Sequence, residues 1–226
     1  SAASDVYKRQ RRPFGRMPTI ATEESSNIVV VMNESFSGLT TYLEGYETST
    51  DPMPYVRSLM KRGDVVSGTC AVSSDMGTGT ANSEFEFLTG NSMAYFKGNT
   101  PYVQFIDMET PSLASLLAGH STMAMHAYER AGYNRVKVYD RFGFEVYKGI
   151  EDFDVDLDYD RGYPTDEANY RQLISYFETV DEPTVVLFFG DHEPRLSNEF
   201  YSNWFTDENE LDLETTAQLH KTPFFI

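Results

Sequence analysis

Two short apolar runs stand out in the hydrophobic pattern of the chain. Asn27–Met32 (NIVVVM) and Thr184–Phe189 (TVVLFF) are continuous, rich in β-branched or aromatic residues, and bounded by polar residues. Runs of this kind are typical of strands buried on both faces of a parallel sheet. We therefore expect both to be buried strands of a parallel sheet.

Helical spacing is clearest in Asp166–Glu178, where Tyr170, Leu173, Ile174 and Phe177 recur at intervals of three and four. Shorter helices are predicted at Pro54–Arg62, at Ala81–Leu88, and at Ser112–Gly119, the last closed by its glycine. Further strands are expected at Val136–Val138 and Thr222–Ile226, and Glu151–Asp160 is interpreted as a solvated loop rather than an exposed edge strand.

Alternating strands and helices predict an α/β fold with a mainly parallel central sheet and helices on both faces. In such sheets the site lies beyond the carboxyl ends of the strands. The chain has 226 residues and 40% apolar residues, which fits one large domain.

Residues 1–26 differ from the rest, because they hold five of the 18 basic residues and no apolar periodicity. We interpret them as a disordered or non-native leader, with the domain at 27–226. The apolar run at Thr222–Ile226 stops abruptly, so we expect the domain to be truncated at its C-terminus.

A formal charge of −17 argues against nucleic acid as a partner and against docking on anionic lipid through a basic patch. The single cysteine, Cys70, excludes an intrachain disulfide and is expected to be a small buried hydrophobe. No run approaches the roughly 18–20 apolar residues of a membrane span, and no signal peptide is evident.

Polar residues follow both apolar runs directly. Glu34 comes after the first, and Asp191 and His192 come after the second. If the two strands are parallel, these side chains meet at one edge of the sheet, where they suit a divalent cation such as Mn²⁺, Mg²⁺ or Zn²⁺. The alternative is that they are ordinary polar residues at strand ends.

Two further segments suit anion binding. Gly77–Phe85 (GTGTANSEF) places close glycines and the hydroxyl of Thr80 at a helix start, although Thr80 could be only an N-cap. His126, followed by Gly132-Tyr133-Asn134-Arg135, provides an imidazole and a guanidinium that can clamp phosphate or sulfate, although such residues are more often surface residues.

In chain order the motifs are NESFS, GTANSEFEFLTGNSM, MHAYERAGYNR and FFGDHEP. Over about residues 27–226 this order and spacing resembles the lipoteichoic acid synthase (phosphoglycerol transferase) branch of the sulfatase-like family. The resemblance implies the alkaline phosphatase/sulfatase-like fold. It implies a nucleophilic Thr80, a cation held by Glu34, Thr80, Asp191 and His192 with Mn²⁺ as the first choice, and a head-group site at His126, Tyr133 and Arg135. Tyr133 stands where the family usually has tryptophan.

The resemblance further implies transfer of phosphoglycerol from phosphatidylglycerol to a polyglycerol-phosphate or glycan acceptor through a covalent threonine intermediate. The work would take place on the extracellular face of a bacterial cell membrane, and the intact protein would carry N-terminal membrane helices that this sequence lacks.

One family feature is absent: a further histidine in a stretch similar to Met-Gln-Asn-His-Gly. Some tens of residues are expected to be missing near Arg161, so the domain is internally shortened. Rival functions on the same fold are phosphoethanolamine transfer, phosphodiester hydrolysis and sulfatase-type hydrolysis, although Cys70 lacks the sequence context of a formylglycine precursor. A rival of another class is an inactive binding or sensor domain.

Overall fold

The computed structural model describes residues 26–38, 50–73, 76–77, 79–96, 98, 100–117, 119–197, 199 and 213–226. The leader predicted at 1–26 lies almost entirely outside these ranges, and so does the side chain of Cys70. The backbone of Cys70 belongs to strand β2 (Ser67–Val72).

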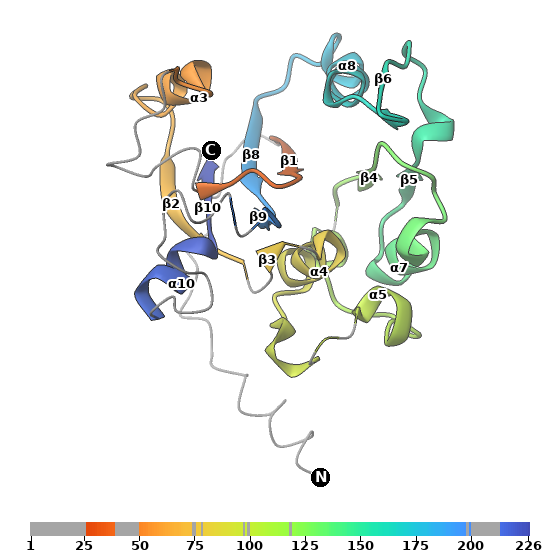
Figure 1. The fold of residues 1–226 in the computed structure, drawn as a ribbon. Helices are drawn as coiled ribbons and strands as arrows, with labels where there is room; N and C mark the ends of the chain where they lie inside the picture. The colour runs from red at the N-terminus through yellow and green to blue at the C-terminus, as the bar shows by residue number, and fades with distance from the viewer. Residues whose placement is uncertain are drawn as a thin grey trace.

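A four-stranded sheet in the order β1-β8-β10-β2 forms one half of the molecule (Figure 1). Strands β1 (Asn27–Asn33) and β8 (Thr184–Gly190) confirm that both runs are strands, and they pair in parallel over their whole length. The predicted burial is wrong for β1, which stands at the end of the described strand order and has no fully buried residue. Strand β10 (Lys221–Phe225) runs antiparallel to both β8 and β2. The sheet is therefore mixed, and the expected mainly parallel sheet is wrong in this respect, because an apolar run does not reveal the direction of its strand.

Three small sheets complete the described strands. Strands β4 (Met123–Met125) and β5 (Val146–Lys148) pair in parallel, as do β3 (Met76–Gly77) and β9 (Glu193–Pro194). Strands β6 (Tyr159–Asp160) and β7 (Tyr163–Pro164) form an antiparallel pair. The β4–β5 pair lies on the opposite side of α4 (Thr80–Thr89) from the four-stranded sheet (Figure 1).

The predicted helices are present with changed lengths. Helix α8 (Asp166–Phe177) ends one residue earlier than predicted, and α4 extends its prediction by one residue at each end. Helices α3 (Pro54–Leu59) and α6 (Leu113–Leu116) are shorter than predicted, and the C-cap of α6 is Leu117 rather than Gly119. The remaining described helices are α5 (Pro101–Gln104), α7 (Arg135–Phe142), α10 (Leu213–Leu219), and the 3₁₀ turns η1 (Met93–Tyr95), η2 (Gly132–Asn134) and η3 (Ile150–Asp152).

The strand predicted at Val136–Val138 is wrong, since these residues lie in α7. The buried residues of α7 are Arg135, Val138, Tyr139 and Phe142, which is helical spacing, so burial of that face overrides the β-propensity of valine. Glu151–Asp160 is mostly irregular, as expected, apart from the end of η3 and the two residues of β6. No described helix has both the length and the apolar character needed to cross a membrane.

Helices lie on both sides of the β1–β8 pair. On one side, Phe87 of α4 packs on Phe189 with ring centroids 4.8 Å apart. On the other side, α8 approaches β1, and the Tyr170 hydroxyl lies 3.1 Å from the side-chain oxygen of Asn33. The first half of β8 is exposed, with Val185 46% and Val186 44% accessible, so this strand is less buried than its sequence suggests.

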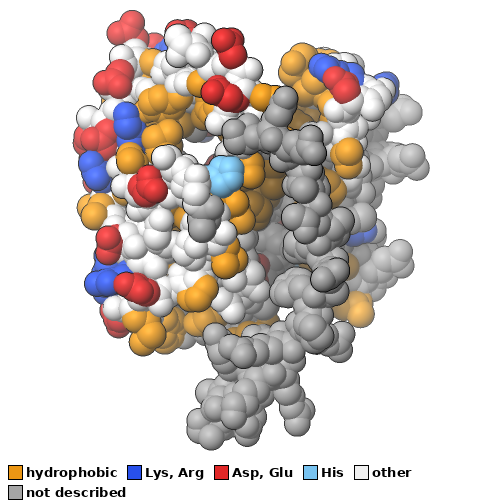
Figure 2. Space-filling view, turned by 180° about the vertical axis from the view of Figure 1, so that it is seen from behind, with side chains coloured by type: hydrophobic (Ala, Val, Ile, Leu, Met, Phe, Trp, Pro, Cys, Tyr) orange, Lys and Arg blue, Asp and Glu red, His pale blue; other side chains and the backbone are white. Residues whose placement is uncertain are grey.

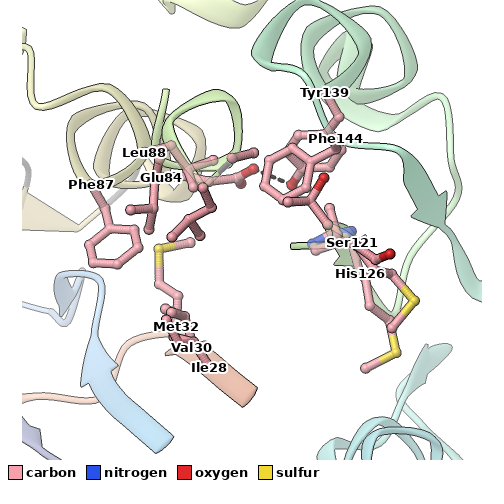
Figure 3. Close-up of a pocket in the computed structure, with 17 residues that line it drawn as sticks. Ile28, Val30, Met32, Glu84, Phe87, Leu88, Ser121, His126, Tyr139 and Phe144 are labelled. Carbon is pink, nitrogen blue, oxygen red and sulfur yellow. Dashed lines mark hydrogen bonds between the residues drawn. The ribbon is translucent and has the colours of Figure 1, made fainter. Parts of the chain in front are cut away.

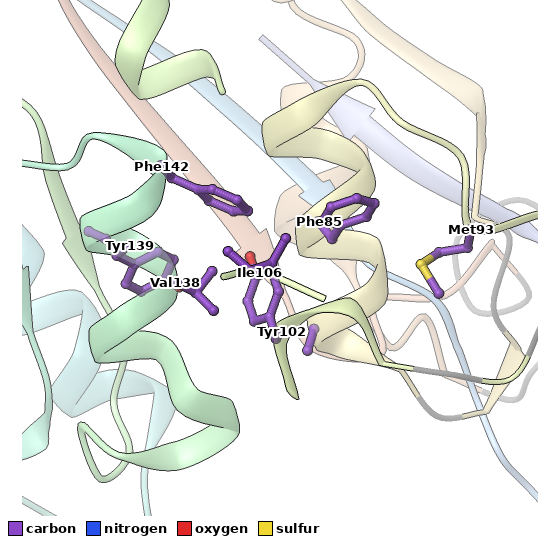
Figure 4. Close-up of a cluster of buried hydrophobic side chains, with 9 residues drawn as sticks. Phe85, Met93, Tyr102, Ile106, Val138, Tyr139 and Phe142 are labelled. Atoms are coloured by element: carbon purple, nitrogen blue, oxygen red, sulfur yellow. The ribbon is translucent and has the colours of Figure 1, made fainter. Parts of the chain in front are cut away.

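The main hydrophobic cluster lies among α4, α5 and α7 rather than within the sheet (Figure 4). Phe85 contributes from α4, Tyr102 from α5, and Val138 and Phe142 from α7, and all four are at most 3% exposed. This cluster fixes α4, which connects the sheet to the α7 region.

Gly190 provides a first test of the fold, because a Cβ added there would lie 1.9 Å from the carbonyl oxygen of Phe36. We expect Gly190→Ala to push the ends of β1 and β8 apart and to lower the free energy of unfolding by about 1–3 kcal/mol in urea titrations, the usual cost of overpacking. Gly63→Ala is the control, since no described residue has an atom within 4 Å of the place its methyl group would take. Equal losses in the two variants would contradict this account.

Candidate metal centre

The parallel pairing of β1 and β8 brings Glu34, Asp191 and His192 to one edge of the sheet. The last paired residues are Asn33 and Gly190, so both chains leave the sheet at the same level. Ser35 adopts a positive φ of 55°, and its backbone N–H donates to Asp191 Oδ1 at 2.7 Å. The backbone N–H of His192 donates to the same oxygen at 2.8 Å. These two bonds fix the Asp191 carboxylate.

Two further contacts bring the start of α4 to this edge. Strand β3 pairs with β9, which begins directly after His192. Ser83 in the first turn of α4 donates from Oγ to the backbone oxygen of Asp191 at 2.9 Å. Gly79 precedes the helix with a φ of 128°, a conformation that favours glycine.

Thr80 is the first residue of α4, and its hydroxyl turns toward the acidic cluster. Oγ1 donates to Glu34 Oε2 at 2.5 Å and lies 3.4 Å from His192 Nε2. The helix is capped by Gly79 without a side-chain hydrogen bond. The alternative that Thr80 serves only as an N-cap is therefore wrong.

Three electron-pair donors converge beside this hydroxyl. His192 Nε2 lies 3.1 Å from Asp191 Oδ2 and 3.5 Å from Glu34 Oε1, and one ligand atom from each residue lies within 4.8 Å of the others. His192 Nδ1 lies 3.0 Å from the carbonyl oxygen of Glu193, so we assign its proton to Nδ1 and a free lone pair to Nε2. Asp191 Oδ2 is buried and has no hydrogen-bond partner among the described residues. A divalent cation would satisfy all three atoms, so the residues fit the metal that the sequence predicted.

Burial, with a further contribution from the negative charge of Glu34, raises the pKa of Asp191. A cation bound here would counter both effects, because it favours the ionised carboxylate. The exposed side of the cluster is Glu34, whose side chain is 62% accessible.

The other three predicted site residues belong to a second group, centred on Glu84 of α4. Arg135 is 1% exposed and donates from Nε and Nη2 to Glu84 Oε2, at 3.2 and 2.9 Å. The hydroxyls of Tyr102 and Tyr139 both donate to Glu84 Oε1. The Tyr133 ring covers the guanidinium of Arg135, with 5.4 Å from Cζ to the ring centroid.

His126 follows β4, and its backbone N–H donates to the carbonyl oxygen of Lys148 at 3.0 Å. Burial, and then the charge of Arg135, lowers the pKa of His126 to about 4. The imidazole is therefore neutral at pH 7, and it offers a neutral hydrogen bond rather than the charge-assisted one expected from the sequence. Nδ1 of His126 is buried without a hydrogen-bond partner in the described part of the chain.

An apolar cavity of about 270 Å³ connects this second group to the sheet. Figure 3 shows His126, Tyr139 and Glu84 across an open space from Ile28, Val30 and Met32 of β1. In the space-filling view, hydrophobic side chains gather around a hollow near the middle of one face (Figure 2).

The structure thus divides the predicted residues into two groups. Glu34, Asp191 and His192 converge as a candidate metal centre with the Thr80 hydroxyl beside them, whereas Arg135 pairs with Glu84, Tyr133 covers its guanidinium, and His126 lines the adjoining cavity. Sequence reasoning missed the positioning roles of Ser35, Ser83 and Glu84. The four-residue spacing of Thr80 and Glu84, which places both on one face of α4, was the available signal for Glu84.

Two carboxylates and an imidazole at the ends of parallel strands, with a hydroxyl at a helix start beside them, form a site that suits metal-assisted chemistry. Residues 26–172 match the model of the family described as Sulfatase, and the chain belongs to this family. The fold prediction is confirmed by solved structures of the alkaline phosphatase superfamily.

A Rhizobium meliloti (strain 1021) protein named "Putative cyclic beta-1,2-glucan modification protein" is 31% identical over 210 residues, which cover 89% of this chain and 31% of that protein. The lipoteichoic acid synthase LtaP of Listeria monocytogenes has a TM-score of 0.70 at 18% identity, covering 88% of this chain and 64% of LtaP. The Streptococcus pyogenes phosphoglycerol transferase GacH has a TM-score of 0.69 at 16% identity, and the match covers 88% of this chain and 67% of GacH. A Vibrio parahaemolyticus protein of the alkaline phosphatase superfamily has a TM-score of 0.68 at 14% identity, and the match covers 90% of this chain and 60% of that protein.

This chain spans about a third of the length of the Rhizobium relative. Since 89% of 226 residues is about 201, the 210 matched positions have no room for a gap of tens of residues in this chain. The stretch expected to be missing near Arg161 is therefore not part of this relative's matching region.

Metal binding is the most direct test of the Asp191 cluster. We expect Mn²⁺ to raise the thermal unfolding midpoint, by the equivalent of about 2.7 kcal/mol at a free concentration of 100 times Kd. Asp191→Asn should abolish that shift. Because the raised pKa of Asp191 means that its ionised form destabilises the metal-free fold, this variant should be no less stable than wild type without metal at pH 8. Asp160→Asn, at an 80% exposed side chain, is the control. A shift that survives in Asp191→Asn would exclude this carboxylate as a ligand.

The pKa of His126 generates a test of stability against pH. In the unfolded chain His126 takes up a proton near pH 6.5, whereas in the folded protein it does so only near pH 4. The contribution of His126 to the free energy of unfolding is therefore fully present above pH 6.5. It is lost as the pH falls from 6.5 toward 4, by about 2 kcal/mol between pH 7 and pH 5. Urea titrations at the two pH values should show this loss reduced in His126→Gln and unchanged in the exposed-site control His120→Gln. The same loss in all three proteins would refute the assignment to His126.

Proposed function

We propose that this domain transfers a phosphoglycerol group from a phosphatidylglycerol-type lipid to a hydroxyl of a glycan or polyglycerol-phosphate acceptor, through a covalent intermediate on Thr80. The observation that carries the proposal is the position of the Thr80 hydroxyl, 2.5 Å from Glu34 Oε2 and 3.4 Å from His192 Nε2. A hydroxyl at a helix N-terminus beside a cation site is suited to attack the phosphorus atom of an anionic phosphate ester.

Glu34, Asp191 and His192 would hold a divalent cation, Mn²⁺ as the first choice, with Thr80 beside it. When bound, the cation would lower the cost of forming the Thr80 alkoxide and of charge on the phosphoryl oxygens. The chain's own residues supply the rest. Glu34 Oε2 accepts a hydrogen bond from the Thr80 hydroxyl, and Ser83 fixes the first turn of α4 to the strand end, so the nucleophile is held in place.

The transfer has two balanced steps. In the first step the Thr80 oxygen bonds to phosphorus as the bond to the diacylglycerol oxygen breaks, and diacylglycerol leaves with the proton that Thr80 has lost. In the second step an acceptor oxygen bonds to the same phosphorus as the bond to Thr80 breaks, and the acceptor's proton returns to the Thr80 oxygen. His126, Tyr133 and Arg135 would contact the glycerol and phosphate of the donor, with Tyr133 as an aromatic wall.

A glycan acceptor is supported by the name of the Rhizobium relative, and a phosphoglycerol donor by that of GacH. Because the donor is a membrane lipid, we place the reaction at the outer face of a bacterial cell membrane. Hydrolysis is the main rival within the family, and it differs only in using water as the acceptor.

Thr80 is the focus of the functional test. With Mn²⁺ and a fluorescent phosphatidylglycerol, we expect wild type to release diacylglycerol and Thr80→Val to lose at least about 10³-fold in rate, because the covalent route is removed. Thr80→Ser, which keeps a hydroxyl, is the matched control and should retain measurable release.

Mass spectrometry of the quenched wild-type reaction should find phosphoglycerol on Thr80. Release that persists in Thr80→Val would remove Thr80 from this role. Absence of release in wild type would favour an inactive binding domain, and free glycerol phosphate in the presence of glycan acceptors would favour hydrolysis.

A further inference from the structure

The charge around Arg135 determines what kind of anion the second group can take. Glu84 is 7% exposed and accepts four hydrogen bonds, two from Arg135 and one each from Tyr102 and Tyr139. The Glu84 carboxylate and the Arg135 guanidinium thus form a buried ion pair, with 2.9 Å between Arg135 Nη2 and Glu84 Oε2. The positive charge of Arg135 is thus balanced inside the protein before any ligand binds.

The same pairing leaves Arg135 a limited capacity for an external anion. Nε and Nη2 both face Glu84, so Nη1 is the guanidinium nitrogen that Glu84 does not engage. Tyr133, 57% exposed, covers the guanidinium on its outer side. A two-pronged contact with two oxygens of one phosphate, the usual mode for an unpaired arginine, is not open to Arg135 in this arrangement.

The neighbouring groups add no net positive charge. Burial keeps the pKa of His126 at about 4, so it is neutral at pH 7. Arg130, the next arginine along this segment, pairs with Asp152 at 3.0 Å. At the metal centre, the two carboxylates Glu34 and Asp191 balance the charge of a divalent cation. The two groups together are therefore close to neutral even when the cation is present.

From this balance we propose that Glu84 is a specificity-determining residue, which neutralises Arg135 so that the site accepts singly charged phosphodiesters and discriminates against doubly charged phosphomonoesters. The inference rests on the proposed function and deepens it, because a phosphatidylglycerol head group is a phosphodiester with one charge. Glu84 acts through Arg135 rather than by touching the ligand. On α4 Glu84 lies four residues from Thr80, about 6 Å along the helix axis.

The test measures binding, so that it does not depend on turnover. Isothermal titration calorimetry at pH 8 with Mn²⁺, on the full chain with Thr80→Ala to prevent reaction, compares two probes. One is glycerophosphoglycerol, a singly charged diester, and the other is glycerol phosphate, a doubly charged monoester. We expect the diester to bind more tightly. Glu84→Gln in the same background should shift the ratio of the two affinities by about tenfold toward the monoester, because it adds one net positive charge at short range.

A second pair of variants covers the case in which Glu84→Gln, with its buried arginine uncompensated, does not fold. Arg135→Gln and Glu84→Gln/Arg135→Gln differ only in the charge of Glu84, and the double variant buries no unpaired charge. The double variant should again favour the monoester by about tenfold over Arg135→Gln. Glu84→Asp, which keeps the charge, should leave the ratio as it is.

Three results would overturn the proposal: tighter binding of the monoester to the Thr80→Ala protein, binding of neither probe, or a ratio that does not change when the charge of Glu84 is removed. A purely structural role for Glu84 would weaken both probes equally and leave the ratio constant. Loss of diacylglycerol release in the turnover assay would instead count against the proposed function, so the two failures are distinguishable.

Discussion

The parallel pairing of β1 with β8 is the constraint on which the rest of the site depends. It brings two strand ends, 157 residues apart in the chain at Glu34 and Asp191, to one edge of the sheet. This arrangement buries the carboxylate of Asp191, whose pKa is raised by burial and by the charge of Glu34. Backbone N–H groups of Ser35 and His192 offset part of that cost by donating to Asp191 Oδ1, and they leave Oδ2 directed at the cation position. The fold therefore stores an electrostatic strain that a divalent ion relieves.

Helix α4 connects the two halves of the site. Its first turn is attached to the strand edge through Ser83 and Asp191, and its second turn carries Glu84, which binds Arg135 at the start of α7. The same helix contributes Phe85 to the main hydrophobic cluster. Because packing and hydrogen bonds both fix α4, Thr80 and Arg135 keep a defined separation.

The buried pair Glu84–Arg135 gives the second group a different character from an open phosphate clamp. A buried ion pair contributes little net stability, but removing one partner is costly. Here the pair also cancels the charge that an anion would seek, while burial makes His126 neutral. This region therefore offers a ligand hydrogen bonds, shape and the aromatic surface of Tyr133 rather than a net charge.

The sequence by itself determined the two strands β1 and β8, the helix α8, and the meeting of Glu34, Asp191 and His192 at one edge, because a continuous apolar run followed by polar residues marks a strand and its end. It did not determine that β10 runs antiparallel to its neighbours, because the hydrophobic pattern of a strand does not depend on the strand's direction. It also gave the wrong structure for Val136–Val138, since β-branched residues suit either class and only the packing of Val138 and Phe142 in the hydrophobic cluster selects the helix. The role of Glu84 and the neutral state of His126 were likewise decided by tertiary structure, since charge balance and desolvation depend on which side chains meet across elements far apart in the chain.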